Sequence, residues 1–202
     1  MFSKIFVKES VDREKDDPLQ WSVSGNTITP TDSKRRGEAG FQFDHIFDMQ
    51  KKNVDVFHTV VKPIVNSAVD GFNGTVFAYG QTGSGKTYTM MGTETESGII
   101  PLAIEYMFDA IESKEGREFL VRFSYFEIYN ERINDLMEVE NTDLKIKDEN
   151  GRVFVNKCSE KITRGANHML TSMRLGEKNR SIGETNMNER SSRSHTIFRI
   201  GI

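Results

Sequence analysis

Apolar positions recur at spacings of three and four residues along two stretches of the chain, as on a helix with one buried face. The first stretch spans residues 53–70, and Pro63 within it is expected to kink or locally loosen the helix. The second begins at Pro101, a favourable first-turn residue, and reaches residue 111. A further helix is expected over residues 166–178, ending near Gly176.

Other segments have the patterns of strands. Residues 40–44 alternate apolar and polar side chains, which predicts a short strand, and residues 119–129 predict a long one. Residues 144–147 and 153–155 flank Asn150-Gly151, a pair typical of a hairpin turn. A final strand is expected over residues 195–202, whereas residues 9–40 are polar, poorly patterned and expected to form loops. Strands alternating with helices predict a layered α/β fold.

The segment Thr75–Tyr79 is apolar without alternation, which is typical of a strand covered on both faces of a parallel sheet. Residues 88–91 can continue as a helix. Between them the chain matches the motif G-x-x-x-x-G-K-[ST] at every position, with Gly80, Gln81, Thr82, Gly83, Ser84, Gly85, Lys86 and Thr87. A strand, a glycine-rich loop and a helix form the context in which this motif binds phosphate.

The residue types of this loop explain its chemistry. Glycines let the backbone curl so that several N–H groups point at phosphate oxygens. Lys86 supplies a positive charge for the β and γ phosphates, and the Thr87 hydroxyl is the expected Mg²⁺ ligand. A chance match in a chain of this length is expected about one per cent of the time. The motif therefore predicts nucleotide binding without specifying which nucleotide.

Composition narrows the choice of partners. The net charge is -3, from 27 basic and 30 acidic residues, so the bulk charge predicts no attraction to nucleic acid. Cys158 is the one cysteine and cannot form an internal disulfide, as expected in a reducing compartment. We find neither a signal peptide nor a span long enough for a membrane, so a cytoplasmic location without membrane association is expected. No repeat or linker divides residues 1–202, which we interpret as one domain.

Four blocks of sequence stand in order along the chain, at residues 41–47, 71–90, 127–136 and 188–195. Together they resemble the kinesin motor domain. The last of them reads Asn-Glu-Arg-Ser-Ser-Arg-Ser-His and resembles the kinesin switch I signature. The resemblance covers roughly residues 40–202, and residues 1–39 diverge from the family. Residues 86–92 and 183–188 are most similar to the centromere-associated protein E class of kinesins.

The resemblance implies a P-loop NTPase fold, a kinesin-like motor core with a central mixed sheet flanked by helices. It also implies ATP and Mg²⁺ as cofactors. By this resemblance Ser192 helps to hold Mg²⁺, Ser191 faces the γ-phosphate and the attacking water, and Asn188 contacts the phosphate side. Arg193 forms the switch I half of a salt bridge to a switch II glutamate, and Tyr88 lies against the adenine.

The implied function is an ATP-dependent microtubule motor, an ATP hydrolase whose turnover is coupled to movement. Its partner is the microtubule, and Lys145 and Lys147 of the expected hairpin are candidate contacts to acidic tubulin. Read without the family, these two lysines are ordinary outward-facing strand charges. The implied location is the microtubule cytoskeleton, including the spindle and kinetochore. Dimerisation is expected through a stalk that lies outside this chain.

Both ends depart from the family pattern. No Arg-x-Arg-Pro segment, which helps to clamp the adenine in kinesins, follows the possible strand at residues 2–8. The switch II motif Asp-Leu-Ala-Gly-Ser-Glu is absent, so we expect a fragment truncated after switch I, without switch II and the neck linker. The alternative is a non-catalytic nucleotide-binding or interaction module. A GTPase is disfavoured because the chain has no Asn-Lys-x-Asp guanine reader.

Overall fold

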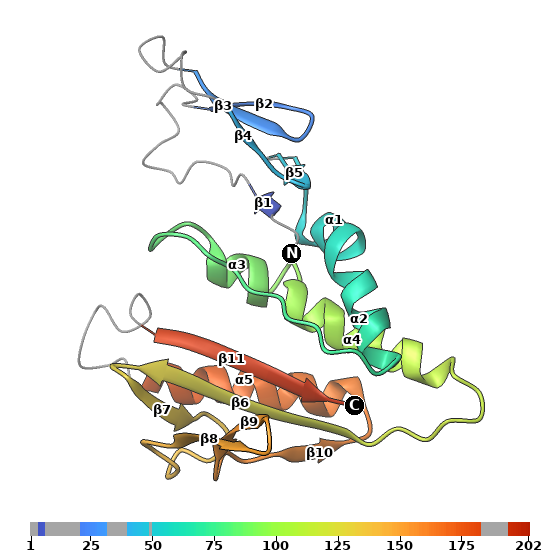
Figure 1. Ribbon diagram of the computed structural model, residues 1–202, viewed down its shortest axis with the longest axis vertical. Coiled ribbons are helices and arrows are strands. Elements are labelled where there is room, and N and C mark those ends of the chain that lie inside the picture. Colours follow the sequence, from blue (N-terminus) through green and yellow to red (C-terminus); the bar gives the residue numbers. More distant parts are fainter. Residues whose placement is uncertain (1–3, 7–20, 32–39, 49, 183–193) are drawn as a thin grey trace. The chain divides into compact units, whose positions relative to one another are not determined.

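The computed structural model describes residues 4–6, 21–31, 40–48, 50–182 and 194–202 (Figure 1). Its helices and its parallel and antiparallel strands confirm the expected α/β class. Two compact units are present, one formed by residues 1–61 and 77–99 and the other by residues 62–76 and 100–202. Within the described residues, no helix is both long enough and apolar enough to cross a membrane.

The first unit contains two small sheets. In one, β1 (Lys4–Phe6) pairs in parallel with β5 (His45–Phe47). The other is antiparallel in the order β2-β3-β4, formed by Trp21–Ser24, Thr27–Pro30 and Phe41–Gln42. The short strand expected at residues 40–44 is thus confirmed as β4.

The interpretation of residues 9–40 as loops is wrong for β2 and β3. Gly25, with a φ of 56°, starts the turn that joins the two strands into a hairpin. All four residues of β2 are exposed, and only Ile28 and Pro30 of β3 are buried. Both strands do alternate, as Trp-Ser-Val-Ser and Thr-Ile-Thr-Pro on either side of Gly25-Asn26, which is a pattern typical of a hairpin. The alternation was missed because each strand has only four residues and lies in a polar segment.

Residues 53–69 are helical throughout, as predicted, in three consecutive elements: α1 (Asn53–Val56), the π-helix η2 (Phe57–Val61) and α2 (Lys62–Val69). Pro63 stands one residue into α2. Proline lacks an N–H group and its ring crowds the carbonyl four residues earlier, so the regular hydrogen-bond ladder cannot pass through it. The wider π-helical turn just before Pro63 is the local loosening that the sequence predicted.

The second unit is built around β6 (Val121–Tyr129), the long strand predicted at residues 119–129. β11 (Ser194–Gly201) pairs with it antiparallel along its whole length and confirms the last expected strand. The short strands β7 (Arg132–Asp135) and β10 (Lys161–Thr163), which the sequence did not indicate, also pair antiparallel with β6.

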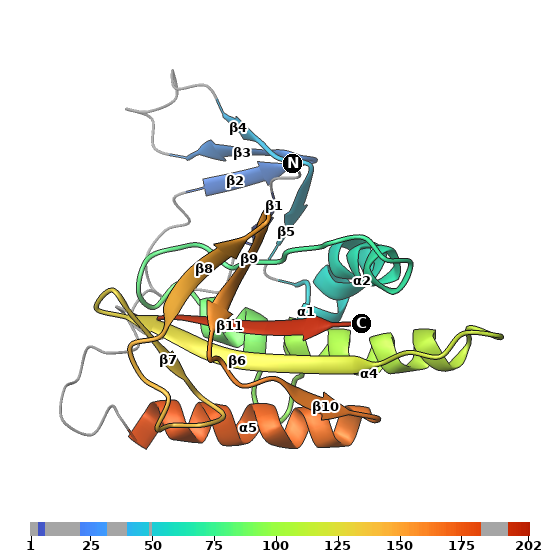
Figure 2. The same ribbon diagram turned by 60° about the horizontal axis from the view of Figure 1, so that its bottom comes forward.

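Helix α5 (Ala166–Ile182) packs along one face of this sheet (Figure 2). The expected end of this helix near Gly176 is wrong, because the helix continues through the glycine. A Cβ at Gly176 would lie 2.5 Å from Cδ1 of Tyr125 on β6, so the glycine allows close packing of helix and strand. The ring of Phe198 on β11 stacks on Phe123 and meets Tyr125 edge-on in the same layer.

Side chains on the other face of β6 form a second apolar cluster around Phe126, Ile133 and Leu144. The predicted hairpin is confirmed beside it as β8 (Lys145–Glu149) and β9 (Arg152–Asn156). Asn150 and Gly151 both have positive φ, 55° and 80°, as the tight hairpin turn requires.

Helix α4 (Ile99–Glu112) confirms the second helix of the sequence pattern. It is joined to α2 by contacts of Tyr106. The Tyr106 hydroxyl donates to Oδ1 of Asn66 at 2.8 Å, and the Lys62 ammonium lies 4.8 Å from the centre of the Tyr106 ring. Beyond the end of α4, Lys114 forms a 2.7 Å ion pair with Asp70.

The prediction of a buried strand at Thr75–Tyr79 is wrong. Residues 72–80 have no regular secondary structure, and Phe77 and Tyr79 expose 70% and 94% of their surface. A strand exists only where a neighbour pairs with its backbone, and none of the described residues does so here. The apolar pattern indicates only that these side chains favour buried surroundings. It does not show that another strand pairs with their backbone. The helix expected next is present as α3 (Lys86–Met91).

Candidate functional site

The glycine-rich loop lies in the first unit, between residue 80 and helix α3. Gly83 and Gly85 have φ values of 81° and 85°, in the left-handed region that strongly favours glycine. A Cβ at Gly80 would lie 2.4 Å from Oγ of Ser84, so the loop closes on itself at this point. The Ser84 N–H donates to the Gln81 carbonyl at 3.2 Å and completes the turn. The motif glycines are therefore required by the conformation.

The Lys86 side chain folds back over this loop. Its ammonium donates to the carbonyl oxygens of Gly80 and Gln81, both at 2.7 Å. An ammonium has three N–H donors, so two are used within the loop and one remains for another acceptor. The positive charge is thus held against the loop by neutral carbonyls, with no carboxylate to neutralise it there among the described residues.

The loop also offers backbone donors. None of the described residues accepts a hydrogen bond from the N–H groups of Gly83, Gly85, Lys86 or Thr87. Successive N–H groups around a left-handed turn form a concave site for an anion. The Thr87 side chain is exposed at the same place. Phosphate oxygens of a nucleotide fit these donors and the fixed ammonium, and a hydroxyl is a suitable ligand for the Mg²⁺ that accompanies them.

Tyr88 is held at both ends. Its hydroxyl donates to Oε2 of Glu96 at 2.7 Å, and its carbonyl accepts from Nδ2 of Asn53 at 3.2 Å. The backbone N–H of Asn53 donates to the other carboxylate oxygen of Glu96 at 3.0 Å. The hydrogen bond from Tyr88, followed by that from the Asn53 N–H, lowers the pKa of Glu96. Asn53 itself is fully buried.

The sequence analysis found only part of this arrangement. The structure brings Gly80 to Tyr88 into one loop and helix start, whereas Asn188, Ser191, Ser192 and Arg193 lie outside the described residues.

Asn53 and Glu96 were missed because no motif contains them. Glu96 lies in the polar segment 93–96, where Glu94 looks equally suitable in the sequence. The partner Asn53 is 43 residues away, and only the fold shows the contact.

Comparison with known proteins identifies close relatives. The kinesin motor domain family model matches residues 6–202. A solved structure of a fast kinesin, described for its ATPase mechanism and interactions with microtubules, is 39% identical with a TM-score of 0.88. That match covers 98% of this chain and 57% of the other chain.

Three curated relatives show the range of similarity. Kinesin-like protein KIN-7I of Oryza sativa subsp. japonica is 51% identical over 90% of this chain and 15% of its own length. Kinesin-like protein KIN-7N of Arabidopsis thaliana is 49% identical over 90% of this chain and 22% of its own length. Centromere-associated protein E of Homo sapiens is 45% identical over 90% of this chain and 7% of its own length. The expected centromere-associated relative is thus found, although the two plant proteins are more similar, and the chain spans less than a quarter of each.

Proposed function

We propose that this chain, which belongs to the kinesin motor domain family, forms the nucleotide site of an ATP-hydrolysing microtubule motor. The observation that carries the proposal is the Lys86 ammonium fixed over a left-handed glycine loop with unused backbone donors. ATP with Mg²⁺ is the ligand of the site. Tyr88 gives the adenine an aromatic face, which adds stacking area at the end of the loop.

Hydrolysis in this proposal depends on positioning and on charge. Mg²⁺, when bound, neutralises part of the phosphate charge. Thr87 and Ser192 hold the metal through their hydroxyls, and Ser191 orients the attacking water. Asn188 contacts the phosphate side, and Arg193 forms the switch I half of a salt bridge. The roles of the switch I residues are supported by the family's switch I signature, which the chain carries at residues 188–195.

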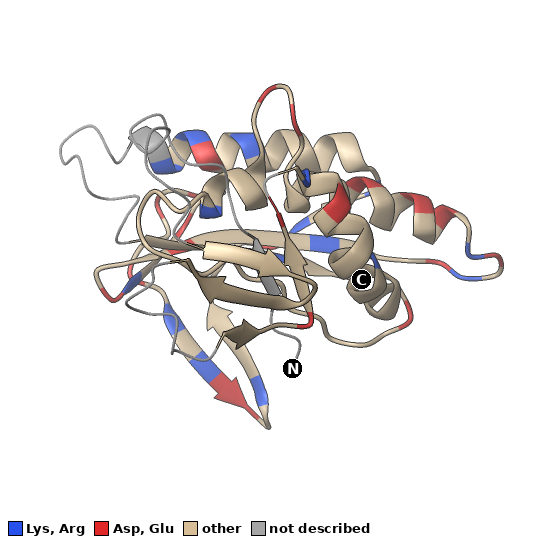
Figure 3. Ribbon diagram, turned by 90° about the horizontal axis from the view of Figure 1, so that it is seen from above, with Lys and Arg blue, Asp and Glu red and all other residues tan. Residues whose placement is uncertain are grey.

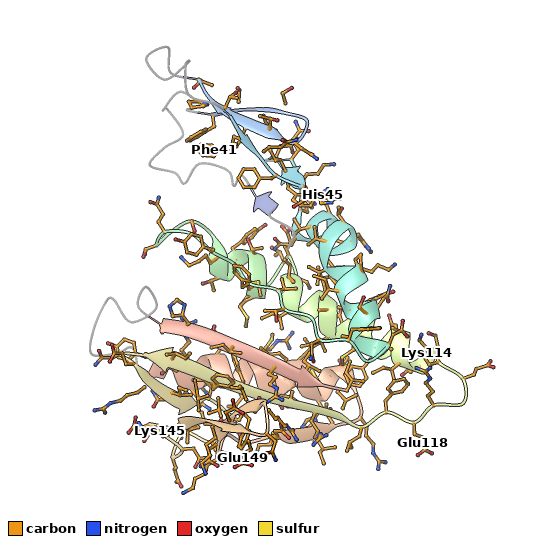
Figure 4. All side chains as sticks on the ribbon, in the orientation of Figure 1. Phe41, His45, Lys114, Glu118, Lys145 and Glu149 are labelled. Atoms are coloured by element: carbon orange, nitrogen blue, oxygen red, sulfur yellow. The ribbon has the colours of Figure 1, made fainter. Side chains whose placement is uncertain are left out.

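The β8–β9 hairpin is the proposed microtubule contact within residues 40–202. The sequence of β8 is Lys-Ile-Lys-Asp-Glu, so its basic positions come before its acidic ones, as the colours in Figure 3 show. Figure 4 places Lys145 and Glu149 at opposite ends of that strand. Lys145 forms an exposed 2.8 Å ion pair with Asp143, whereas Lys147 has no ion pair among the described residues. Lys147 is therefore the more available charge for acidic tubulin.

The proposed location is the microtubule cytoskeleton of the cytoplasm. The similarity to centromere-associated protein E supports the spindle and kinetochore as specific sites. Dimerisation through a stalk outside residues 1–202 belongs to the same proposal.

Replacement of Lys86 tests the nucleotide site. Lys86→Ala in the intact protein should weaken Mg·ATP binding by about 1.5–3 kcal/mol, roughly 10- to 150-fold, because a charged hydrogen-bond donor is lost. Titration calorimetry measures the affinity, and Lys51→Ala, an exposed lysine of the same unit, is the matched control. Equal affinity of the Lys86 variant and the parent protein would show that the loop is not the nucleotide site.

A further inference from the structure

The carboxylate of Glu96 is held in place before any ligand arrives. Each of its oxygens accepts one hydrogen bond, Oε1 from the Asn53 N–H at 3.0 Å and Oε2 from the Tyr88 hydroxyl at 2.7 Å. The backbone of Glu96 is fixed as well. Its N–H donates to Oγ1 of Thr93 at 3.1 Å, and its carbonyl accepts from the Thr93 N–H at 2.7 Å. Glu94, two residues earlier, is exposed and makes no such contact among the described residues.

The loop that carries Glu96 has little room to move. Gly92 and Ser97 form a bridge across it, and the Gly98 N–H donates to the Met91 carbonyl at 3.3 Å. A Cβ at Gly92 would lie 2.2 Å from the Glu96 carbonyl oxygen, and one at Gly98 would lie 2.4 Å from the Gly92 nitrogen. The two backbone segments are therefore in direct contact. A short closed loop of this kind returns the chain from the end of α3 to the side of Tyr88.

The fixed Glu96 carboxylate restricts the orientation of the Tyr88 ring. The hydroxyl stands at the far end of the ring, so a hydrogen bond there restricts the direction in which the whole side chain points. The Tyr88 carbonyl accepts from Asn53 at 3.2 Å and from the Gly92 N–H at 2.9 Å, which restricts the backbone end. An aromatic side chain held in this way loses little further freedom when a flat ligand packs on it.

We propose that Glu96 is a positioning residue for the nucleotide base: its carboxylate holds the Tyr88 ring in the orientation that receives the base. This inference rests on the proposed ATP site and adds a residue outside the glycine-loop motif. The lowered pKa of Glu96, caused first by the Tyr88 hydroxyl and then by the Asn53 N–H, agrees with an ionised acceptor at neutral pH. The glycine loop and Lys86 recognise phosphates, so Glu96 acts on the base alone.

The test separates the base from the phosphates. Binding of Mg·ATP and of Mg·tripolyphosphate, which has no base, is measured by calorimetry on the intact protein. Glu96→Ala should weaken Mg·ATP binding roughly two- to tenfold, because the freed Tyr88 ring must then be immobilised when the base binds, and should leave tripolyphosphate binding within about twofold. Glu96→Gln, which keeps an acceptor oxygen and a polar partner for the tyrosine, should recover most of the loss. Glu94→Ala is the matched control and should bind both ligands like the parent protein.

A double-mutant cycle isolates the contact itself. Tyr88→Phe removes the hydroxyl and keeps the ring, so adding it to Glu96→Ala should cause little further loss of Mg·ATP affinity. Losses that add fully would overturn the proposal, and so would equal weakening of ATP and tripolyphosphate by Glu96→Ala, or no weakening at all. If the parent protein binds neither ligand, the nucleotide site itself is refuted and Glu96 has no base to position. Thermal unfolding of each variant confirms that the comparison is made between folded proteins.

Discussion

Cys158 is a half-buried thiol beside a buried carboxylate. Burial first, and the nearby Asp135 charge second, raise the pKa of Cys158 from 9.0 to about 12. Asp135 is fixed in this position because it accepts hydrogen bonds from the N–H groups of Met137 and Ser159 at 2.8 and 2.6 Å. The thiolate is therefore strongly disfavoured in the folded protein.

Slow reaction of this thiol with disulfide reagents is the expected result. At pH 8 the raised pKa lowers the thiolate fraction of Cys158 by roughly a thousandfold relative to an ordinary cysteine, and the thiolate is the reactive form. The reaction rate with an aromatic disulfide is compared before and after unfolding in urea. Equal rates in the two states would contradict the burial of Cys158 described by the structure.

The residues of the candidate site differ in how well the sequence predicts their role. Gly83, Gly85 and Lys86 could be predicted because phosphate binding imposes a fixed spacing along a continuous segment. Glu96 and Asn53 could not, because their contact joins residues 43 positions apart and no spacing rule connects them. Such contacts depend on how loops return to the site, which local patterns do not encode.

Gly176 shows how one position governs the packing of two elements. It lies within α5, where glycine weakens a helix, yet a Cβ there would meet the Tyr125 ring of β6 at 2.5 Å. A Cβ at Gly165, just before the same helix, would have no neighbour within 4 Å. The two glycines therefore differ in packing although they belong to the same part of the fold.

The variant Gly176→Ala should destabilise the protein by about 1–3 kcal/mol, because the added methyl group forces helix and strand apart. Gly165→Ala is the control and should change the free energy of unfolding by less than about 1 kcal/mol. Urea denaturation followed by circular dichroism gives both values. A Gly176 variant as stable as the parent protein would mean that α5 does not pack as described.

Elements with a long and regular pattern were predictable, as α4, β6 and the β8–β9 hairpin show. Strands β2 and β3 were missed although both alternate apolar and polar residues, because each has only four residues within a polar segment. The segment Thr75–Tyr79 failed in the opposite way. Its apolar residues suit a strand covered on both faces, but no described strand pairs with it. Sequence pattern thus reports which surroundings a segment favours, whereas pairing depends on the rest of the fold.

Charge acts at the scale of the whole molecule. The net charge of -3 gives no general attraction to an acidic polymer, so the proposed binding to microtubules must come from local basic positions. Lys147 on the β8–β9 hairpin is exposed and has no ion pair among the described residues. The proposed contact therefore depends on a small part of the surface.

Reversal of this charge gives a specific prediction. Lys147→Glu should weaken microtubule binding at least several-fold, since attraction to acidic tubulin becomes repulsion, and added salt should reduce the difference. Mg·ATP affinity should stay unchanged. Lys51→Glu makes the same charge change in the other unit, outside the hairpin, and serves as the control in a cosedimentation assay. Equal loss in both variants would assign the effect to net charge.

The α/β class, the phosphate loop and the family could all be inferred from the sequence, because each depends on continuous segments with a strong pattern. The family model matching residues 6–202 agrees with that inference. The arrangement of β7 and β10 around β6 could not be predicted, since strands of three or four residues carry too little pattern.

The proposed motor function requires that ATP turnover by this protein is coupled to microtubules. Its most direct test is the steady-state ATPase rate of the intact protein, measured against increasing microtubule concentration, with Lys86→Ala as the inactive control. We predict a rate that rises with microtubule concentration and saturates in the parent protein, and a low constant rate in the variant. Normal binding of Mg·ATP with a rate that microtubules do not change would contradict the motor function and favour a non-catalytic nucleotide-binding module.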